Sequence, residues 1–259
     1  MPTITTSDGA ELACRVAGPV TAPVLLLLQG QANSHRWWDT VEPVLSQTFR
    51  TVRFDYRGTG QSRSEYGAWS TSSFADDAAQ VLDALEIPSA HVYGTSMGGR
   101  IAQMLAIGHP HLVDRLVLAC TSPGGAIAAE RSNDVRRRLA DPDPQARRRA
   151  LVELFYTPDW ARVHASSTLF GDSTMTAKAQ QLHLRVSARH DASQRLAEIV
   201  APTLVLHGGD DLMSPVENAH AIAGRIPGSA VEITDRGRHG FFDEFSDVVT
   251  PRVVAFLAA

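Results

Sequence analysis

Apolar and polar positions along the chain fall into two alternating patterns. Short runs of β-branched and aliphatic residues, several of them continuously apolar, are typical of parallel strands that are buried on both faces. They predict strands at residues 11–16, 24–28, 51–54, 91–93, 116–119, 203–207 and 230–234. Helical patterns lie between these runs, and the alternation predicts an α/β fold with a mostly parallel central sheet.

Residues 74–85 give the clearest helical pattern, because their apolar side chains are spaced three and four apart. We place Asp76 and Asp77 in the first turn of this helix, where negative charge interacts favourably with the helix dipole. Pro88 cannot continue a helix, so we expect the helix to end before it. Residues 100–107 predict a second helix.

The stretch from residue 124 to residue 196 interrupts the alternation. It contains no convincing strand run, is rich in arginine, alanine and glutamine, and is divided by Pro142, Pro144 and Pro158. We therefore expect residues 124–196 to form a helical cap inserted between two core strands, and residues 1–123 and 197–259 to form the core. Some apolar cap residues should hold the cap on the core, and others should line a pocket for a hydrophobic or aromatic substrate group. The candidates are Leu154, Phe155, Tyr156, Trp160, Phe170 and Met175.

Two arginine clusters in the cap, residues 136–138 and 147–149, raise the question of an anionic partner. Acidic residues are interspersed with these arginines and few aromatic residues accompany them, which favours a solvated helix face over a nucleic-acid site. The formal net charge of -4 gives no overall attraction to nucleic acid or to an anionic membrane. We expect a small-molecule substrate, and the sequence leaves the oligomeric state open.

The composition is that of an ordinary globular protein, with 259 residues of which 44% are hydrophobic and 20% charged. Cys14 and Cys120 form neither a disulfide framework nor a metal-ligand spacing. The N-terminus lacks the features of a signal peptide, and the longest aliphatic run is far below the ~20 residues that span a bilayer. We therefore expect a cytoplasmic protein with no membrane partner and no metal.

Residues 94–98 read Gly-Thr-Ser-Met-Gly and follow an apolar run, where a strand should turn sharply into a helix. In such a G-x-S-x-G turn the two backbones approach so closely that a Cβ on Gly94 or Gly98 would clash. Ser96, held at the apex, is a candidate nucleophile. The N–H of Met97, at the start of the helix, is a candidate donor to an oxyanion.

A serine hydroxyl needs a general base and an acid that orients this base, and parallel sheets place such residues after their strands. Asp210 and Asp211 follow the strand at 203–207, and His239 follows the strand at 230–234. The chain order of serine, acid and histidine is that of an α/β-hydrolase triad. Either aspartate could be the acid on this reasoning alone.

The remaining candidates near these motifs are interpreted as structural. His207 should pack at the end of its strand, Asp55 should anchor its loop by bonding nearby backbone, and at least one of Trp37 and Trp38 should pack in the core. The histidines interpreted as surface or structural groups are His91, His109, His111, His183, His190 and His220.

Taken together, the motifs resemble those of the α/β-hydrolase superfamily over almost the whole chain. They are similar to those of small bacterial esterases and lactonases, including 3-oxoadipate enol-lactonase-like proteins and the methylesterases of polyketide pathways. Residues 55–62 resemble the D-x-R-G-x-G-x-S loop, residues 207–215 resemble the segment that carries the acid, and residues 248–257 resemble the terminal helix after the late histidine.

The resemblance implies a triad of Ser96, Asp211 and His239, with Asp211 favoured over Asp210 by the family spacing and by Pro215. By family position, it also implies Gln31 N–H as the second oxyanion donor. Gln29 and Gly30 stand where the family usually has His-Gly.

The expected activity is hydrolysis of a carboxylic ester or lactone through an acyl-enzyme, without a cofactor. The same residues could serve a C–C bond (β-diketone) hydrolase or a cofactor-free perhydrolase. A receptor-like binding protein on this fold is the alternative of another class. The sequence assigns no residue to substrate binding.

Overall fold

The computed structural model describes residues 2–164 and 166–259, and its described strands form one sheet in the order β1-β2-β4-β3-β5-β6-β7-β8. β3 to β8 are mutually parallel, whereas β1 and β2 pair antiparallel at one end of the sheet. The mostly parallel α/β architecture predicted from the sequence is confirmed. The strands are β1 Thr3–Thr5, β2 Glu11–Ala17, β3 Val24–Leu28, β4 Arg50–Phe54, β5 Ala90–Thr95, β6 Val113–Ala119, β7 Thr203–Gly208 and β8 Ala230–Thr234.

Successive residues of the central strands point into two different apolar cores. In β3, Leu26 and Leu28 belong to the core that contains residues of α2 and α3, while Leu25 and Leu27 belong to the core that contains residues of α1 and α10. Both faces of the sheet are therefore covered, which explains the continuously apolar strand sequences. The helices of these layers are α1 Glu42–Leu45, α2 Thr71–Ala84, α3 Met97–Gly108, α8 Glu217–Ala223, α9 Phe241–Glu244 and α10 Ser246–Ala258.

The start of α2 differs from the prediction. The helix begins at Thr71, because Ser70 and Ser73 form a reciprocal capping box that fixes its N-terminus. Asp76 and Asp77 consequently lie in the second turn, and placing them in the first turn was wrong. Asp77 instead accepts hydrogen bonds from Arg57, at 2.7 Å from Nε and 2.6 Å from Nη2.

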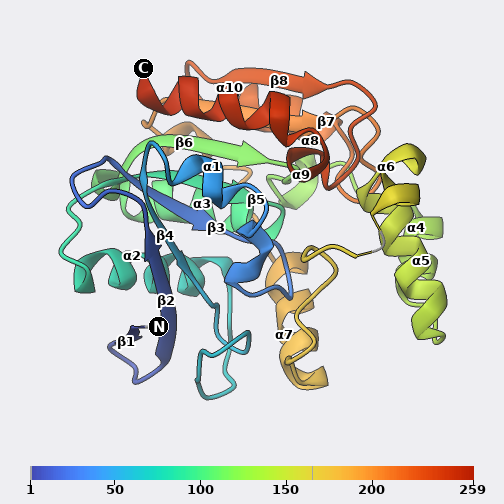
Figure 1. The fold of residues 1–259 in the computed structure, drawn as a ribbon, viewed down its shortest axis with the longest axis horizontal. Coiled ribbons are helices and arrows are strands. Elements are labelled where there is room, and N and C mark those ends of the chain that lie inside the picture. Colours follow the sequence, from blue (N-terminus) through green and yellow to red (C-terminus); the bar gives the residue numbers. More distant parts are fainter. Residues whose placement is uncertain (1, 165) are drawn as a thin grey trace.

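The described residues between β6 and β7 contain helices and no strand of the sheet. Pro144 and Pro158 occupy the first positions of α5 and α6, where a missing N–H costs nothing. In Figure 1, α4, α5 and α6 lie together at the end of the molecule toward which the β6 and β8 arrows point, and α7 lies apart from them. These helices are α4 Asn133–Leu139, α5 Pro144–Phe155, α6 Pro158–Val163 and α7 Ala177–Ala188.

The arginine clusters of this segment lie on exposed helix surfaces. Arg136 pairs with Glu130 at 2.6 Å, and Arg138 pairs with Glu153. These pairs agree with the predicted solvated faces. No helix in the described part of the chain is both long enough and apolar enough to cross a membrane.

Candidate active site

Ser96 lies on the turn between β5 and α3, in a backbone conformation that few non-glycine residues adopt (φ 53°, ψ -118°). A Cβ on Gly98 would overlap the carbonyl oxygen of Leu28 and lie 2.6 Å from that of Gln29. A Cβ on Gly94 would overlap the Gly98 carbonyl oxygen. The close approach expected from the sequence is present, and both glycines are required for it.

His239 and Asp211 lie beside this serine, each on a loop after a neighbouring parallel strand. His239 Nε2 is 3.0 Å from Ser96 Oγ, and His239 Nδ1 is 2.7 Å from Asp211 Oδ2. Since a carboxylate only accepts, Nδ1 carries the proton and donates a hydrogen bond to Asp211, which leaves the lone pair of Nε2 facing the hydroxyl. Asp211 and His239 are 3% and 2% exposed, so bulk water barely screens this contact.

Backbone and side-chain donors fix the Asp211 carboxylate. Its Oδ1 accepts the N–H groups of Met213 and Ser214 at 2.8 and 2.9 Å. His207 Nε2 donates to the Ser214 carbonyl at 2.7 Å and lies 3.5 Å from Asp211 Oδ2. Burial acts to raise the pKa of Asp211, but its electrostatic and hydrogen-bond interactions with His239 and His207 outweigh the burial and hold this pKa well below its ordinary value. Asp210, the alternative acid, is exposed to solvent.

The segment after β3 reaches the same turn. β3 and β5 pair in parallel with Leu28 opposite Gly94, and the Leu28 and Gln29 carbonyls lie against Gly98 in the first turn of α3. Met97 begins α3, so its N–H has no partner within the helix. Gln31 is two residues beyond Gln29, on the segment that approaches this helix start.

Gln29, which replaces the histidine expected from the family, is a buried structural residue. Its Nε2 donates to the Phe54 carbonyl at 2.8 Å, and its own carbonyl accepts the Tyr56 hydroxyl at 3.2 Å. The side chain therefore connects the ends of β3 and β4.

Asp55 and the two tryptophans have the structural positions predicted for them. Asp55 accepts the N–H groups of His35 and Gln61 at 2.7 and 2.9 Å, which anchors two loops. Trp37 and Trp38 are both buried, and Trp37 Nε1 donates to Thr95 Oγ1 at 2.8 Å.

Helix α5 contacts the loop that carries His239, a contact that sequence patterns did not reveal. The N–H groups of His239 and Gly240 donate to the Leu154 and Phe155 carbonyls at 3.2 and 2.8 Å. The Phe155 ring meets the His239 ring edge to face, with centroids 5.1 Å apart. The segment between β6 and β7 therefore touches the candidate base directly.

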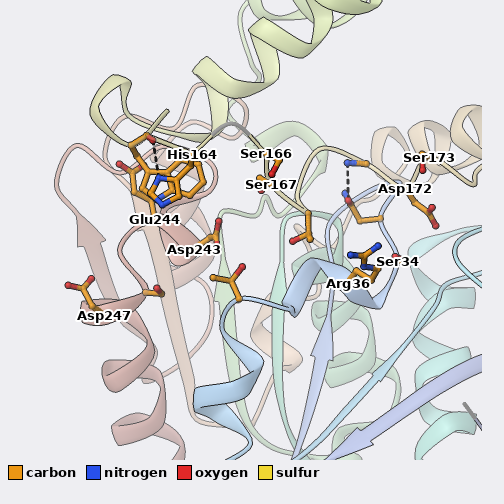
Figure 2. A pocket seen from close by; sticks show the side chains of 16 residues that line it. Ser34, Arg36, His164, Ser166, Ser167, Asp172, Ser173, Asp243, Glu244 and Asp247 are labelled. Atoms are coloured by element: carbon orange, nitrogen blue, oxygen red, sulfur yellow. Dashed lines mark hydrogen bonds between the residues drawn. The ribbon is translucent and has the colours of Figure 1, made fainter. Parts of the chain in front are cut away.

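A groove of about 850 Å³ is lined by residues of the segments 33–40, 160–164, 166–173 and 243–247 (Figure 2), and Ser96, Asp211 and His239 are not among its lining residues. Figure 2 shows Asp243, Glu244 and Asp247 on one side, and Ser34, Arg36 and Asp172 on the other. Of the apolar cap residues named from the sequence, Trp160 lines this groove. The rings of Tyr156 and His164 stack on the Trp160 ring, at centroid distances of 3.7 and 4.0 Å. The buried members of that set are Leu154, Phe155, Tyr156 and Met175.

The described residues contain no cluster of three or more His, Cys, Asp or Glu side chains that could hold a metal ion. The candidate site is the hydrogen-bonded set of Ser96, His239 and Asp211.

A serine on a sharp strand–helix turn, in a mostly parallel sheet of this order, defines the class of α/β proteins built around a nucleophile elbow. The chain belongs to the alpha/beta hydrolase fold family, whose model matches residues 23–246.

Individual relatives agree with this membership. A protein of Agrobacterium fabrum named "Putative carbamate hydrolase RutD" is 30% identical, over 91% of this chain and 93% of its own length. The esterase RhEst1 of Rhodococcus sp. ECU1013 is 25% identical, with a TM-score of 0.86 over 100% of this chain and 98% of that one. The enol-lactonase of Burkholderia xenovorans LB400, 24% identical, shares the fold with a TM-score of 0.83 over 100% of both chains. Family and relatives support a hydrolase with carbamate hydrolase and esterase relatives.

Proposed function

We propose that the protein is a serine hydrolase that cleaves a carboxylic ester or lactone through Ser96, His239 and Asp211. The observation that carries the proposal is the hydrogen-bonded series from Ser96 Oγ to His239 Nε2, at 3.0 Å, and from His239 Nδ1 to Asp211 Oδ2, at 2.7 Å. Such a series links a nucleophile, a base and the group that orients the base.

In the first half of the reaction, His239 Nε2 takes the proton of Ser96 Oγ as this oxygen attacks the carbonyl carbon. The N–H groups of Met97 and Gln31 donate to the oxyanion, which needs fixed donors rather than reorganising water. His239 then gives the proton to the leaving alcohol oxygen. In the second half, His239 takes a proton from water as the water oxygen attacks the acyl carbonyl carbon. His239 then gives this proton to Ser96 Oγ as the bond between Oγ and the acyl carbon breaks, which releases the acid and restores Ser96.

A carbamate is the second candidate substrate, because the Agrobacterium fabrum relative named above matches over nearly its whole length. Attack on a carbamate carbonyl uses the same three side chains and the same oxyanion donors. The leaving group, rather than the nucleophile, would distinguish the two substrates.

Residues 124–196 act, in this proposal, as a cap over the site for a small-molecule substrate. The contacts of α5 with the His239 loop support this role, since the Phe155 ring lies against the ring that faces Ser96.

Labelling with a fluorophosphonate, followed by peptide mass mapping, tests the proposal. We expect one adduct on Ser96, none in Ser96→Ala, and strongly reduced labelling in His239→Ala. Ser72→Ala, an exposed serine on α2, is the matched control and should label like the wild type. Turnover should fall about 10⁴-fold or more in either active-site variant.

A folded wild-type protein that takes no label would contradict the proposal and favour a binding protein on this fold. A panel of p-nitrophenyl esters, lactones, aryl carbamates and β-diketones then separates the candidate chemistries.

A further inference from the structure

The segment that follows β3, residues 29–33, is referred to below as the oxyanion loop. Ala32 in this loop has φ 57°, a left-handed conformation that is unfavourable for a residue with a Cβ. Such a conformation persists only where the surroundings hold it.

Both polar groups of the peptide between Gln31 and Ala32 have fixed partners. The Gln31 carbonyl accepts from Asn33 Nδ2 at 2.8 Å, within the loop. The Ala32 N–H donates to His183 Nδ1 at 3.3 Å, across 151 positions of sequence. The plane of the peptide adjacent to the Gln31 N–H is therefore set partly by a side chain of helix α7.

The surroundings of His183 make its Nδ1 a hydrogen-bond acceptor. Its Nε2 donates to the Arg57 carbonyl at 2.9 Å, so in the neutral ring the proton is on Nε2 and Nδ1 presents a lone pair. The ring is fully buried, and the rings of Tyr56, Trp69 and Phe74 lie around it at centroid distances of 6.4, 5.8 and 5.5 Å. Burial lowers the pKa of His183 to about 4, against the opposing effect of the Arg57 hydrogen bond, so the ring is neutral near pH 7.

A second contact from the same part of the chain holds the rest of the loop. Asp172 N–H donates to the Ala32 carbonyl at 2.8 Å, and Gly171 N–H donates to Asn33 Oδ1 at 3.0 Å. Asp172 Oδ2 in turn accepts Gly60 N–H at 2.5 Å, which ties the 171–172 segment to the core.

We propose that His183 is a positioning residue for the oxyanion hole, because by accepting the Ala32 N–H it orients the Gln31 N–H toward the reacting carbonyl oxygen. The inference rests on the proposed function. The residue touches no substrate, and its effect is transmitted through one peptide of the loop.

Two isosteric variants separate the two hydrogen bonds of the ring. His183→Asn retains an acceptor near the position of Nδ1, whereas His183→Gln retains a donor near the position of Nε2 and loses the acceptor. Both remove the ring from the same aromatic cluster, so each controls for the packing loss of the other.

We expect kcat on a p-nitrophenyl ester to fall about 10- to 100-fold in His183→Gln and to stay within about threefold of the wild type in His183→Asn. KM should change little in either variant. Inhibition by an alkyl trifluoromethyl ketone, whose adduct oxygen occupies the oxyanion position, should weaken in parallel with kcat/KM. Hydrogen exchange of the Ala32 amide should be faster in His183→Gln than in His183→Asn.

Equal kcat values in the two variants, or equal exchange of the Ala32 amide, would overturn the inference. A loss of activity caused by unfolding would appear in both variants, and kcat would fall in proportion to the unfolded fraction. Hydrogen exchange of the Ala32 amide is measured without turnover, so it tests the contact with His183 even if the wild type hydrolyses no ester. A wild type that hydrolyses no ester would count against the proposed function and not against this contact.

Discussion

At the scale of single residues, the proposed role of Asp211 is to orient the base through the direction of one hydrogen bond. Its Oδ1 is occupied by two backbone N–H groups, so Oδ2 is the oxygen that accepts from His239 Nδ1 at 2.7 Å. An asparagine of the same shape could turn an N–H₂ group toward that nitrogen. The ring would then carry its proton on Nε2, where the lone pair for Ser96 is needed.

Asp211→Asn is therefore expected to lower kcat about 10⁴-fold with little change in fold, because the histidine is held in the wrong tautomer. Asp210→Asn, at the exposed neighbouring position, should keep kcat within a few-fold of the wild type. Steady-state hydrolysis of a p-nitrophenyl ester measures both, and circular dichroism verifies folding. A comparable loss in both variants, or a loss in Asp210→Asn alone, would exclude Asp211 as the orienting acid.

Residue roles differ in how far the sequence could predict them. Gly94 and Gly98 could be identified because their steric demand belongs to a local turn of five residues. His183 was interpreted only as a surface or structural histidine, because its contact with Ala32 depends on the path of the chain between them. Side chains that act across such a separation leave no periodic signal in the sequence.

At the scale of elements, consecutive carbonyls at the carboxyl end of α5 accept hydrogen bonds from consecutive residues of the loop that carries the candidate base. The last carbonyls of a helix have no partner within it, and here three consecutive residues supply the donors. The Glu153, Leu154 and Phe155 carbonyls accept, in that order, from the side chain of Arg238 and from the N–H groups of His239 and Gly240. Arg238 Nη1 also donates to the Tyr156 carbonyl at 3.0 Å.

Arg238→Met keeps the aliphatic part of the side chain and removes its donors, so we expect a looser loop around His239. The expected effect is about a tenfold fall in kcat at nearly constant KM, and a loss of about 1–2 kcal/mol in the free energy of unfolding. Arg238→Lys should restore part of the loss in kcat and part of the loss in the free energy of unfolding. Ester hydrolysis measures the first quantity and urea unfolding the second.

Arg236→Met is the matched control, because Arg236 is exposed and its ion pair within the described residues is with Asp159, at 3.7 Å. An equal change in the two methionine variants would show that the contact with α5 does not position the base.

The sequence predicted element boundaries correctly where the local pattern of residues was clear. The run at Val24–Leu28 forms a strand with the predicted bounds, since an aliphatic run buried in the sheet is unambiguous. Ala230–Thr234 also has the predicted bounds, although its side chains are exposed or half-buried. The start of α2 was misplaced because the capping serines precede the first apolar residue of the pattern. β1 was missed because it has three residues, with Ile4 as its one buried side chain.

At the scale of the whole molecule, the mostly parallel sheet and the edge at which the candidate residues gather followed from the alternation of patterns, because parallel sheets gather their loops at one edge. The contacts between residues 124–196 and that edge did not follow. They join α5 to the His239 loop and α7 to the oxyanion loop, and such pairings are set by tertiary packing rather than by propensity.

The same packing buries two histidines and thereby makes the stability of the fold depend on pH. Burial lowers the pKa of His183 to about 4, and burial together with the charge of Arg100 lowers the pKa of His190 to about 3. An unfolded chain protonates both near pH 6.5, so between pH 6.5 and about 4 the unfolded state binds more protons and stability falls with falling pH. Asp8 and Asp211, whose pKa values are lowered, lose their contribution as the pH falls through the unfolded carboxylate pKa of about 3.9 and below, so most of that loss lies below this window.

The free energy of unfolding should accordingly decrease on acidification from pH 7.5 to pH 4.5, by about 2–3 kcal/mol for each of the two histidines. Urea unfolding at the two pH values measures the decrease. His190→Asn should abolish its share, because the side chain no longer titrates, while His220→Asn, at an exposed position of α8, should leave the decrease unchanged. If His190→Asn loses as much stability on acidification as the wild type, the buried ring of His190 is not what makes the fold sensitive to acid. A decrease that first appears below pH 4 would instead assign the acid sensitivity to the carboxylates.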